Sequence, residues 1–218
     1  NLSKFLWGGI SVLNAEKKSN MNYVEILGGT LKTSSDSTEV SKENFRQGLD
    51  GLTGCITFYN SDVKIVNTIF ENLHCEDAIN IFNSNFDIDR SIFKNASYDA
   101  IDSDFSNGEI KNSDFINIFN DGIDLSGSNV VVSNITFKKI MDKAISVGER
   151  SNLVAKNLTV LSSNMGVVSK DSSKALVIDS LFENITEYAL MSYIKKKQFE
   201  GAMLDCKKCV FNIEKDKI

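Results

Sequence analysis

Hydrophobic and polar positions along the chain follow a repeat of about 22 residues. A small residue recurs at intervals of 22 or 23 positions, and an aliphatic residue directly follows it in each repeat. A second column is occupied mainly by phenylalanine. The small column contains Cys55, Ala78, Ala100, Gly122, Ala144, Gly166 and Ala189, and the phenylalanine column contains Phe70, Phe93, Phe115, Phe137, Val160 and Phe182. Such agreement between columns indicates a solenoid of equivalent coils, in which each coil buries its inward face against its neighbours.

Within each repeat, apolar and polar residues alternate over short stretches, as in Val63-Lys-Ile65 and Phe86-Asp-Ile88. A period of two is typical of β-strands. Asn, Ser, Gly and Asp residues separate these stretches and favour turns. Leucine-rich repeats have a similar length, but their Leu-x-x-Leu-x-Leu pattern is missing. We therefore predict an all-β fold, a single-stranded right-handed parallel β-helix of about eight coils, each with three short strands.

The repeat also defines the expected domain organisation, which is one β-helix domain over residues 1–218. Residues 1–30 are interpreted as an N-terminal coil, and residues 31–50 as a polar loop or excursion. Residues 51–194 contain the regular coils, and residues 195–218 the C-terminal coil and cap. Proline is absent, so no proline-rich linker marks a boundary. The first residue is Asn, which fits a processed secreted protein or a segment of a longer one.

Charge and cysteine content limit the partners and cofactors. The formal net charge is −5 and the sequence pI is near 5.0, which argues against nucleic acid as the main partner. No run approaches the roughly 18 apolar residues of a membrane span, so we expect no membrane insertion. Cys206-Lys-Lys-Cys209 has the spacing of half a zinc site, but Cys55 and Cys75 lie several coils away. We expect free or locally paired cysteines.

The coils resemble the right-handed β-helix repeats of the pectate-lyase-like superfamily, as in Asn112-Ser-Asp-Phe115-Ile-Asn117. The stretch Asp142-Lys-Ala-Ile-Ser-Val-Gly-Glu149, followed by Ser169-Lys-Asp171, is similar to an uncharacterised group of bacterial secreted β-helix repeat proteins. The resemblance covers roughly residues 52–213. It implies the fold but leaves the activity open, because the superfamily includes lyases, hydrolases, epimerases, adhesins and phage spikes.

Carboxylates replace Asn, Thr and Ser at outward positions over two or three coils. Two residues after the small column the chain has Thr57, Asn80, Asp102, Asp124, Ser146, Val168 and Met191. The preceding aliphatic residues face the core, so alternation directs Asp102 and Asp124 outward on neighbouring rungs about 5 Å apart. The acidic residues that we place along this one edge are Glu76, Asp77, Asp99, Asp102, Asp104, Asp121 and Asp124.

Stacked carboxylates repel one another, and three explanations of the column are open. Solvation and outward splay of the side chains is the simplest. A hard cation such as Ca²⁺ is the second, and its candidate ligands are Asp99, Asp102, Asp104, Asp121 and Asp124. The third is a catalytic pair in which a raised pKa keeps one acid protonated, with Asp121, Asp124 and Asp102 as candidate catalytic residues and Lys143 as a helper.

Family motifs give the enzyme hypothesis partial support. Asn120-Asp121-Gly122-Ile123-Asp124 is similar to the Asn-Thr-Asp-Gly segment of polygalacturonase-type glycoside hydrolases, which provides one catalytic Asp. The Asp-Asp, Gly-His-Gly and Arg-Ile-Lys motifs of those enzymes are missing, and the only histidine, His74, lies upstream and is interpreted as incidental. Pectate-lyase-type elimination uses acidic Ca²⁺ ligands with an Arg or Lys base, for which Lys111 and Lys143 are the nearer candidates.

Three functions follow as hypotheses. The first is a secreted or cell-surface module that binds a polysaccharide or a cell-surface protein partner, with Ca²⁺ on the acidic edge. The second is a polysaccharide-modifying enzyme, a lyase or a glycoside hydrolase, that uses the cluster between Asp99 and Asp124. The third is a structural segment of a spike or adhesin. Apart from Ca²⁺, the sequence indicates no cofactor.

Overall fold

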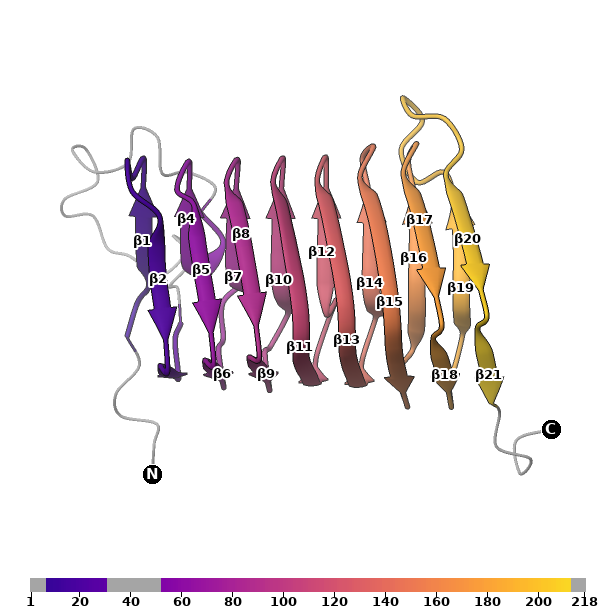
Figure 1. Cartoon of the computed structure of the whole chain (residues 1–218), viewed down its shortest axis with the longest axis horizontal. Helices are drawn as coiled ribbons and strands as arrows, with labels where there is room; N and C mark the ends of the chain where they lie inside the picture. Colours follow the sequence, from indigo (N-terminus) through magenta and orange to yellow (C-terminus); the bar gives the residue numbers. More distant parts are fainter. Residues whose placement is uncertain (1–6, 31–51, 213–218) are drawn as a thin grey trace, which may run out of the picture.

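The computed structural model describes residues 7–30 and 52–212, so the predicted loop at 31–50 lies outside the described residues. The chain winds into an elongated solenoid in which each strand pairs in parallel with the equivalent strand of the next coil (Figure 1). Across the described ranges all regular elements are strands, which confirms the all-β prediction. Within these same ranges, no helix has the length and apolar character that a membrane crossing requires.

One sheet contains a short strand from every coil, and we call it the short-strand sheet. Of the eight strands that the described residues contribute to it, six have a neighbour on both sides, so the solenoid has about six full turns, slightly fewer than the predicted eight coils. Its strands in spatial order are β1 (Ile10–Leu13), β4 (Gly54–Tyr59), β7 (Asp77–Phe82), β10 (Asp99–Asp104), β12 (Ile123–Ser126), β14 (Lys143–Gly148), β16 (Met165–Lys170) and β19 (Tyr188–Tyr193).

The rest of each coil forms the second sheet. Its main path is β2 (Ser19–Asn22), β5 (Val63–Val66), β8 (Asn85–Asp89), β11 (Asn107–Ile118), β13 (Asn129–Ile140), β15 (Asn152–Leu161), β17 (Lys174–Ile178) and β20 (Met203–Lys207). Off this path lie β3 (Glu25–Leu27), β6 (Ile69–Glu71), β9 (Ile92–Lys94), β18 (Leu181–Glu183) and β21 (Val210–Asn212). In the middle coils two of the three predicted strands are continuous, because Asn112, Asn134 and Asn157 bend the strand at positive φ without ending it.

The core consists of the inward columns that the repeat predicts. In the short-strand sheet, Ile101 pairs in register with Ile123. The rings of the phenylalanine column are stacked, with centroids 4.8 Å apart between Phe93 and Phe115 and 4.9 Å apart between Phe115 and Phe137. Like side chains therefore pack on like along the whole rod, and one continuous apolar core runs through it.

Asparagine ladders hold the corners. Asn residues adopt positive φ there more easily than most other residues, and their side chains bond to the coil before. The Nδ2 of Asn95 donates to the Oδ1 of Asn72 at 3.0 Å, and the Nδ2 of Asn117 donates to the Oδ1 of Asn95 at 3.1 Å. These repeated bonds fix the register between coils.

The four cysteines form two local disulfides. Cys55 pairs with Cys75, and Cys206 pairs with Cys209, with Cα–Cα distances of 5.4 and 6.1 Å. The Cys206-Lys-Lys-Cys209 segment is thus a closed disulfide loop at the last described coil and not half of a zinc site. Local pairing, one of the two alternatives predicted, is what the structure has.

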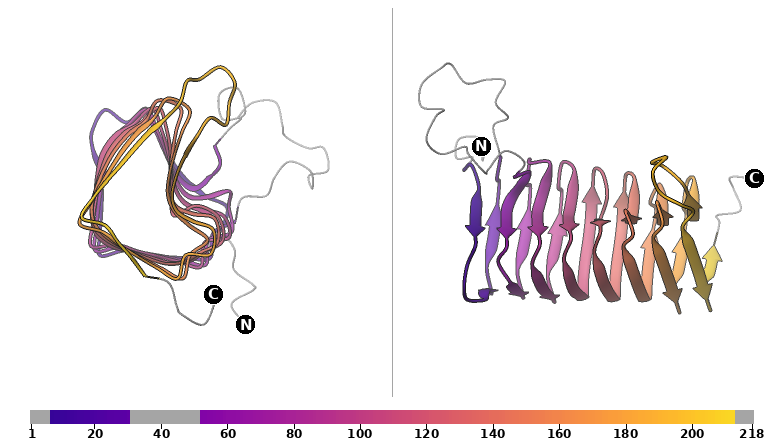
Figure 2. Two further views of the ribbon diagram at one scale, coloured as in Figure 1. Left: turned by 90° about the vertical axis from the view of Figure 1, so that its right-hand side faces the viewer. Right: turned by 90° about the horizontal axis from the view of Figure 1, so that it is seen from above.

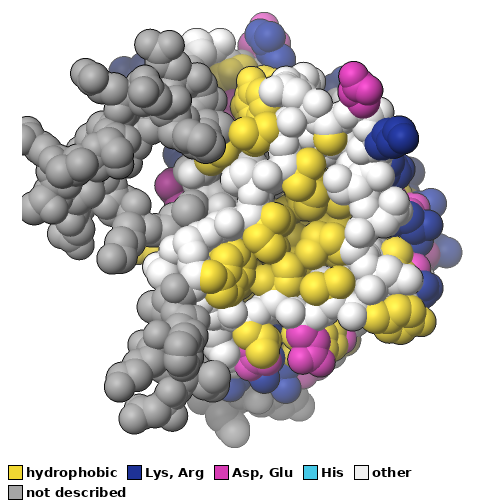
Figure 3. Space-filling view, turned by 90° about the vertical axis from the view of Figure 1, so that its left-hand side faces the viewer, with side chains coloured by type: hydrophobic (Ala, Val, Ile, Leu, Met, Phe, Trp, Pro, Cys, Tyr) yellow, Lys and Arg dark blue, Asp and Glu magenta, His cyan; other side chains and the backbone are white. Residues whose placement is uncertain are grey.

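The surface of the rod has two features that the repeat alone does not describe. Seen along the rod, the outline of the coils is indented on one side, next to the corner where residues 194–202 loop out (Figure 2). At the β1 end of the rod, hydrophobic side chains gather in the middle of the end face (Figure 3). Ile10, Leu13 and Leu27 are among the exposed apolar residues of this end.

Candidate functional site: the acidic face

The predicted acidic residues lie on the outward side of the short-strand sheet. We call the outward side of β7, β10 and β12 the acidic face; its carboxylates are Asp77, Asp99, Asp102, Asp104, Asp121 and Asp124. Outward side chains of this sheet are buried to an unusual degree, since Ser146 and Val168 are both 0% exposed. Both residues lie beside the acidic face, on β14 and β16, and the outline of the coils is indented on one side (Figure 2).

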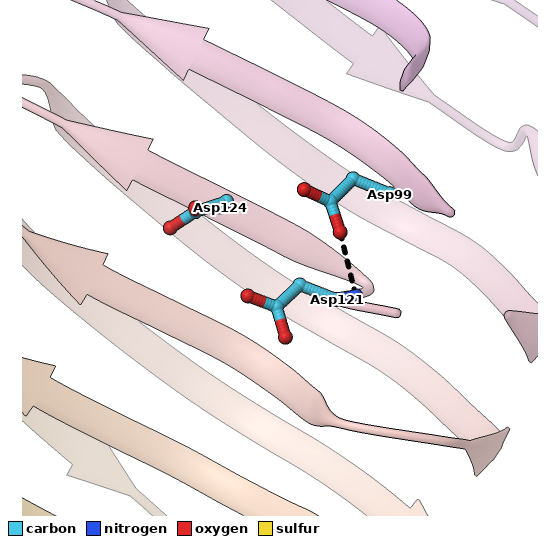
Figure 4. Close-up of side chains that lie close together, drawn as sticks. All are labelled: Asp99, Asp121 and Asp124. Atoms are coloured by element: carbon cyan, nitrogen blue, oxygen red, sulfur yellow. Dashed lines mark hydrogen bonds between the residues drawn. The ribbon is translucent and has the colours of Figure 1, made fainter. Parts of the chain in front are cut away.

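The strand register brings the carboxylates together as the repeat predicts. Asp102 of β10 pairs with Asp124 of β12, and Asp99 of β10 pairs with Asp77 of β7. One carboxylate oxygen each of Asp99, Asp121 and Asp124 lies within 4.8 Å of the others (Figure 4). This group of three is a geometry that can hold a metal ion.

Two of the three carboxylates also have a structural role. One oxygen of Asp99 accepts hydrogen bonds from the backbone N–H of Asp121 and from the Nδ2 of Asn120, both at 2.7 Å. One oxygen of Asp121 accepts from the backbone N–H of Lys143 at 2.9 Å. These bonds link consecutive coils and fix the orientation of both carboxylates. The second oxygen of each remains for a ligand.

Three buried polar atoms on this side of the sheet have no hydrogen-bond partner. They are Asp77 Oδ2, Asp124 Oδ1 and Ser146 Oγ. Ser146 pairs in register with Asp124, so its side chain points to the same outward side. A buried polar atom without a partner costs about 1–3 kcal/mol. Their gathering on one face is a second, independent sign that this face accommodates a ligand.

Lysines bound the acidic face on the next coils. The Nζ of Lys143 lies 3.4 Å from Asp121 Oδ1 and is also paired with Asp142. Lys170 is only 5% exposed, and its Nζ reaches to 3.9 Å from Asp124 Oδ1. The stem of Lys170 lies over Gly148, where an added Cβ would come within 2.8 Å of the lysine Cε. The sequence prediction included Lys143 and missed Lys170. The sequence signal for Lys170 is Gly148, which occupies the outward column of Asp104 and leaves room for the lysine stem.

Burial raises the pKa of several of these acids. Removal from water is the largest cause in each case, and neighbouring carboxylates add to it. The pKa of Asp102 is raised to about 10, and that of Asp121 to about 8. Asp77 is raised to about 8, where a hydrogen bond from Thr53 opposes the shift, and Asp99 to about 6. Without a counter-ion, the face therefore retains protons at neutral pH.

The remaining predicted residues divide between the face and its surroundings. Asp102 and Asp104 lie on the face, outside the group of three; Asp102 Oδ2 accepts a hydrogen bond from Asn80 Nδ2 at 3.2 Å. Lys111 pairs with Asp87 and Glu109 on the second sheet, so it is not a base for this face. The Nδ1 of His74 lies 2.7 Å from Ser97 Oγ at the corner before β7.

Comparison with known families agrees with the architecture. Residues 8–182 match a family model described as "Right handed beta helix region". No curated protein matches the chain. The predicted likeness to one group of bacterial secreted proteins stays a prediction.

Proposed function

The chain belongs to the right-handed β-helix family, and from this premise we propose that it is a β-helix module that binds Ca²⁺ on the acidic face and presents that face to a polysaccharide. One observation carries the proposal. Carboxylate oxygens of Asp99, Asp121 and Asp124 converge within 4.8 Å on the acidic face, where Asp121 is buried and Asp99 and Asp124 are half-buried. Like charges so close together are unfavourable until protons or a cation neutralise them.

The chemistry of the donors favours a hard cation. The converging side chains offer only oxygen atoms, and Ca²⁺ takes six to eight oxygen ligands from carboxylates, carbonyls and water. The hydroxyl of Ser146, which pairs in register with Asp124, is a further oxygen on the same side. Softer metals prefer histidine or thiolate ligands. The four thiols are all in disulfides, and His74 lies at a corner outside the group of three.

Two features support the proposed location outside the cytoplasm and the proposed polysaccharide partner, respectively. Both disulfides suit an oxidising compartment, because intracellular thiols are normally kept reduced. A rigid rod with repeated outward columns presents a long surface suited to an extended polymer. Secretion or display at the cell surface and a polysaccharide partner are therefore parts of the proposal.

Calorimetry with CaCl₂ at pH 7.5 tests the cation site. We expect wild type to bind Ca²⁺, and Asp124→Asn to bind it at least about 10-fold more weakly, because one charged ligand is lost. Asp114→Asn is the matched control, since Asp114 lies on β11 in the second sheet. It should bind as wild type does. Absence of heat for wild type, or equal affinity of Asp124→Asn, would remove the cation from the proposal.

A second candidate function is a polysaccharide-modifying enzyme that uses the same face. The observation in its favour is the separation of pKa values, about 10 for Asp102 against about 6 for Asp99, on one strand. One acid is then protonated while the other is ionised, as general acid–base catalysis on glycosides requires. The residues to substitute in a test of this function are Asp102, Asp121 and Asp124, together with the nearby Lys143 and Lys170.

Product analysis separates this candidate from a binding module. A panel of uronate-rich glycans is incubated with the protein and assayed for new reducing ends and for unsaturated products. An enzyme should release one of the two, and Asp102→Asn should reduce the rate by at least about 100-fold as a lost general acid does. If no product forms from any glycan of the panel but glycan binding is measurable, the result favours the binding module.

A further inference from the structure

The corner between β10 and β11 departs from the repeat. In the two preceding coils this corner is Asn60 and Asn83, at φ 47° and 46°. Asn83 donates its Nδ2 to the Oδ1 of Asn60 at 2.7 Å, as one step of an asparagine ladder. In the next coil the corner is Phe105, with φ 50° and 60% of its surface exposed. The ladder ends there.

Phenylalanine is an unfavourable choice at this corner in three respects. A bulky residue with positive φ is strained, whereas Asn tolerates this conformation. The ladder loses a side-chain hydrogen bond, and a large apolar ring remains in contact with water. Residues that violate the local rules without a gain in stability concentrate at functional sites. Phe105 fits that description.

The ring of Phe105 has a prepared setting. It contacts Phe82 edge to face, with centroids 5.5 Å apart, and Phe82 in turn stacks on Tyr59 at 5.0 Å. The corner of the next coil is Gly127, where an added Cβ would come within 2.7 Å of the Phe105 ring. We call Tyr59, Phe82 and Phe105 the aromatic row. The glycine leaves room for the ring to extend the row by one coil.

The aromatic row adjoins the acidic face. Tyr59 pairs in register with Phe82, and Phe82 pairs with Asp104, so these two members of the row occupy the outward column that continues into Asp104. Phe105 directly follows Asp104 in the chain. Asp124 lies three residues before the corner of the next coil, which is roughly 10 Å along the strand at 3.3 Å per residue. A ligand the size of a disaccharide spans that distance.

We propose that the aromatic row is a stacking platform for a neutral pyranose ring of the polysaccharide whose neighbouring sugar lies over the acidic face. The inference rests on the proposed carbohydrate function and names the part of the ligand that this surface binds. A pyranose ring has an apolar face of C–H groups and a rim of hydroxyls. The exposed ring of Phe105 matches the face, with the half-buried rings of Phe82 and Tyr59 beside it, and the adjoining Asp104 matches the rim. Nucleic acid, the other common partner of exposed aromatics, is disfavoured by the carboxylates.

Substitution of Phe105 by Asn tests the platform and restores the ladder at the same time. The probes are soluble hexasaccharides of β-1,4-linked glucose, β-1,4-linked galactose and α-1,4-linked galacturonate, titrated calorimetrically in the presence of CaCl₂. We expect wild type to bind a neutral probe and Phe105→Asn to bind it at least 10-fold more weakly. The melting temperature of this variant should be equal to or above that of wild type, because its new side chain can donate its Nδ2 to the Oδ1 of Asn83 and extend the ladder by one coil.

Two further variants make the result specific. Tyr23→Asn is the matched control, because Tyr23 is also an exposed aromatic (79%) at positive φ (54°), in the first described coil. It should bind the probe as wild type does. Phe105→Tyr keeps an aromatic face and should retain affinity within about 3-fold. Together they distinguish loss of the ring from loss of the fold.

The outcomes separate the platform from the function on which it rests. Equal affinity of wild type and Phe105→Asn overturns the platform and leaves a carbohydrate-binding module. A fall in the melting temperature of Phe105→Asn by more than 5 °C overturns the argument that Asn fits this corner better. If wild type binds none of the three probes, the proposed carbohydrate function fails first, and the platform with it.

Discussion

Replacement of Phe115 by alanine is expected to lower the free energy of unfolding by about 3–5 kcal/mol. The ring is fully buried in the middle of the phenylalanine column, between the rings of Phe93 and Phe137. Both neighbours belong to coils whose backbones are fixed by parallel hydrogen bonds on either side. The walls of the cavity therefore relax little, and the cost stays near the upper end of the range.

Equilibrium denaturation by urea measures this loss, with Phe119→Ala as the control. Phe119 lies four residues later on the same coil and is 62% exposed, so its removal should change stability by no more than about 0.5 kcal/mol. Similar losses for both variants would contradict the continuous core. A changed denaturant slope in Phe115→Ala would show instead that the rod unfolds in parts.

The core of the structure could be predicted because every coil repeats the same order of inward apolar residues and turn residues. A residue that faces the core in one coil does so in the next, so the phenylalanine column follows from spacing alone. The same argument placed Asp102 beside Asp124, and the observed register confirms that pairing. The direction of a side chain in a β-strand is fixed by period two, and the stacking of coils then fixes its neighbour.

The burial of side chains on and beside the acidic face could not be predicted from the spacing of the repeat. Alternation indicates that Ser146 points outward but not that it is buried. Lys170 reaches Asp124 from two coils away, across Gly148, which depends on the conformation of a long side chain. Phe105 was likewise hidden, because its significance lies in a positive φ that only the backbone reveals.

Without a cation, the free energy of unfolding is expected to fall as the pH rises from about 4 to about 8. Burial raises the folded-state pKa of Asp77 and Asp121 to about 8 and that of Asp102 to about 10, from an ordinary value of 3.8. Within this pH window the folded protein holds more protons than the unfolded chain. Stability then decreases with pH, by up to about 1.4 kcal/mol per pH unit for each such proton.

Urea denaturation in chelator at pH 5 and pH 8 measures this effect, and we expect a difference of at least about 4 kcal/mol in favour of pH 5, which one proton retained over three pH units contributes. Asp102→Asn should be more stable than wild type at pH 8 and should show a smaller pH dependence, because the amide resembles the protonated acid. Asp114→Asn, on the second sheet, should keep the wild-type slope. A stability that rises with pH in chelator would contradict the burial of these carboxylates.

Calcium should reverse the trend, because protons and the cation compete for the same oxygens. At pH 8 the group of three holds fewer protons than at pH 5, because the pKa of Asp99 is about 6 and that of Asp121 about 8, and Ca²⁺ at 100 times its dissociation constant adds about 2.7 kcal/mol. At pH 5 the protonated face binds Ca²⁺ weakly and the gain should shrink. A gain that is the same at both pH values would place the cation elsewhere on the rod, away from the carboxylates whose pKa is raised by burial.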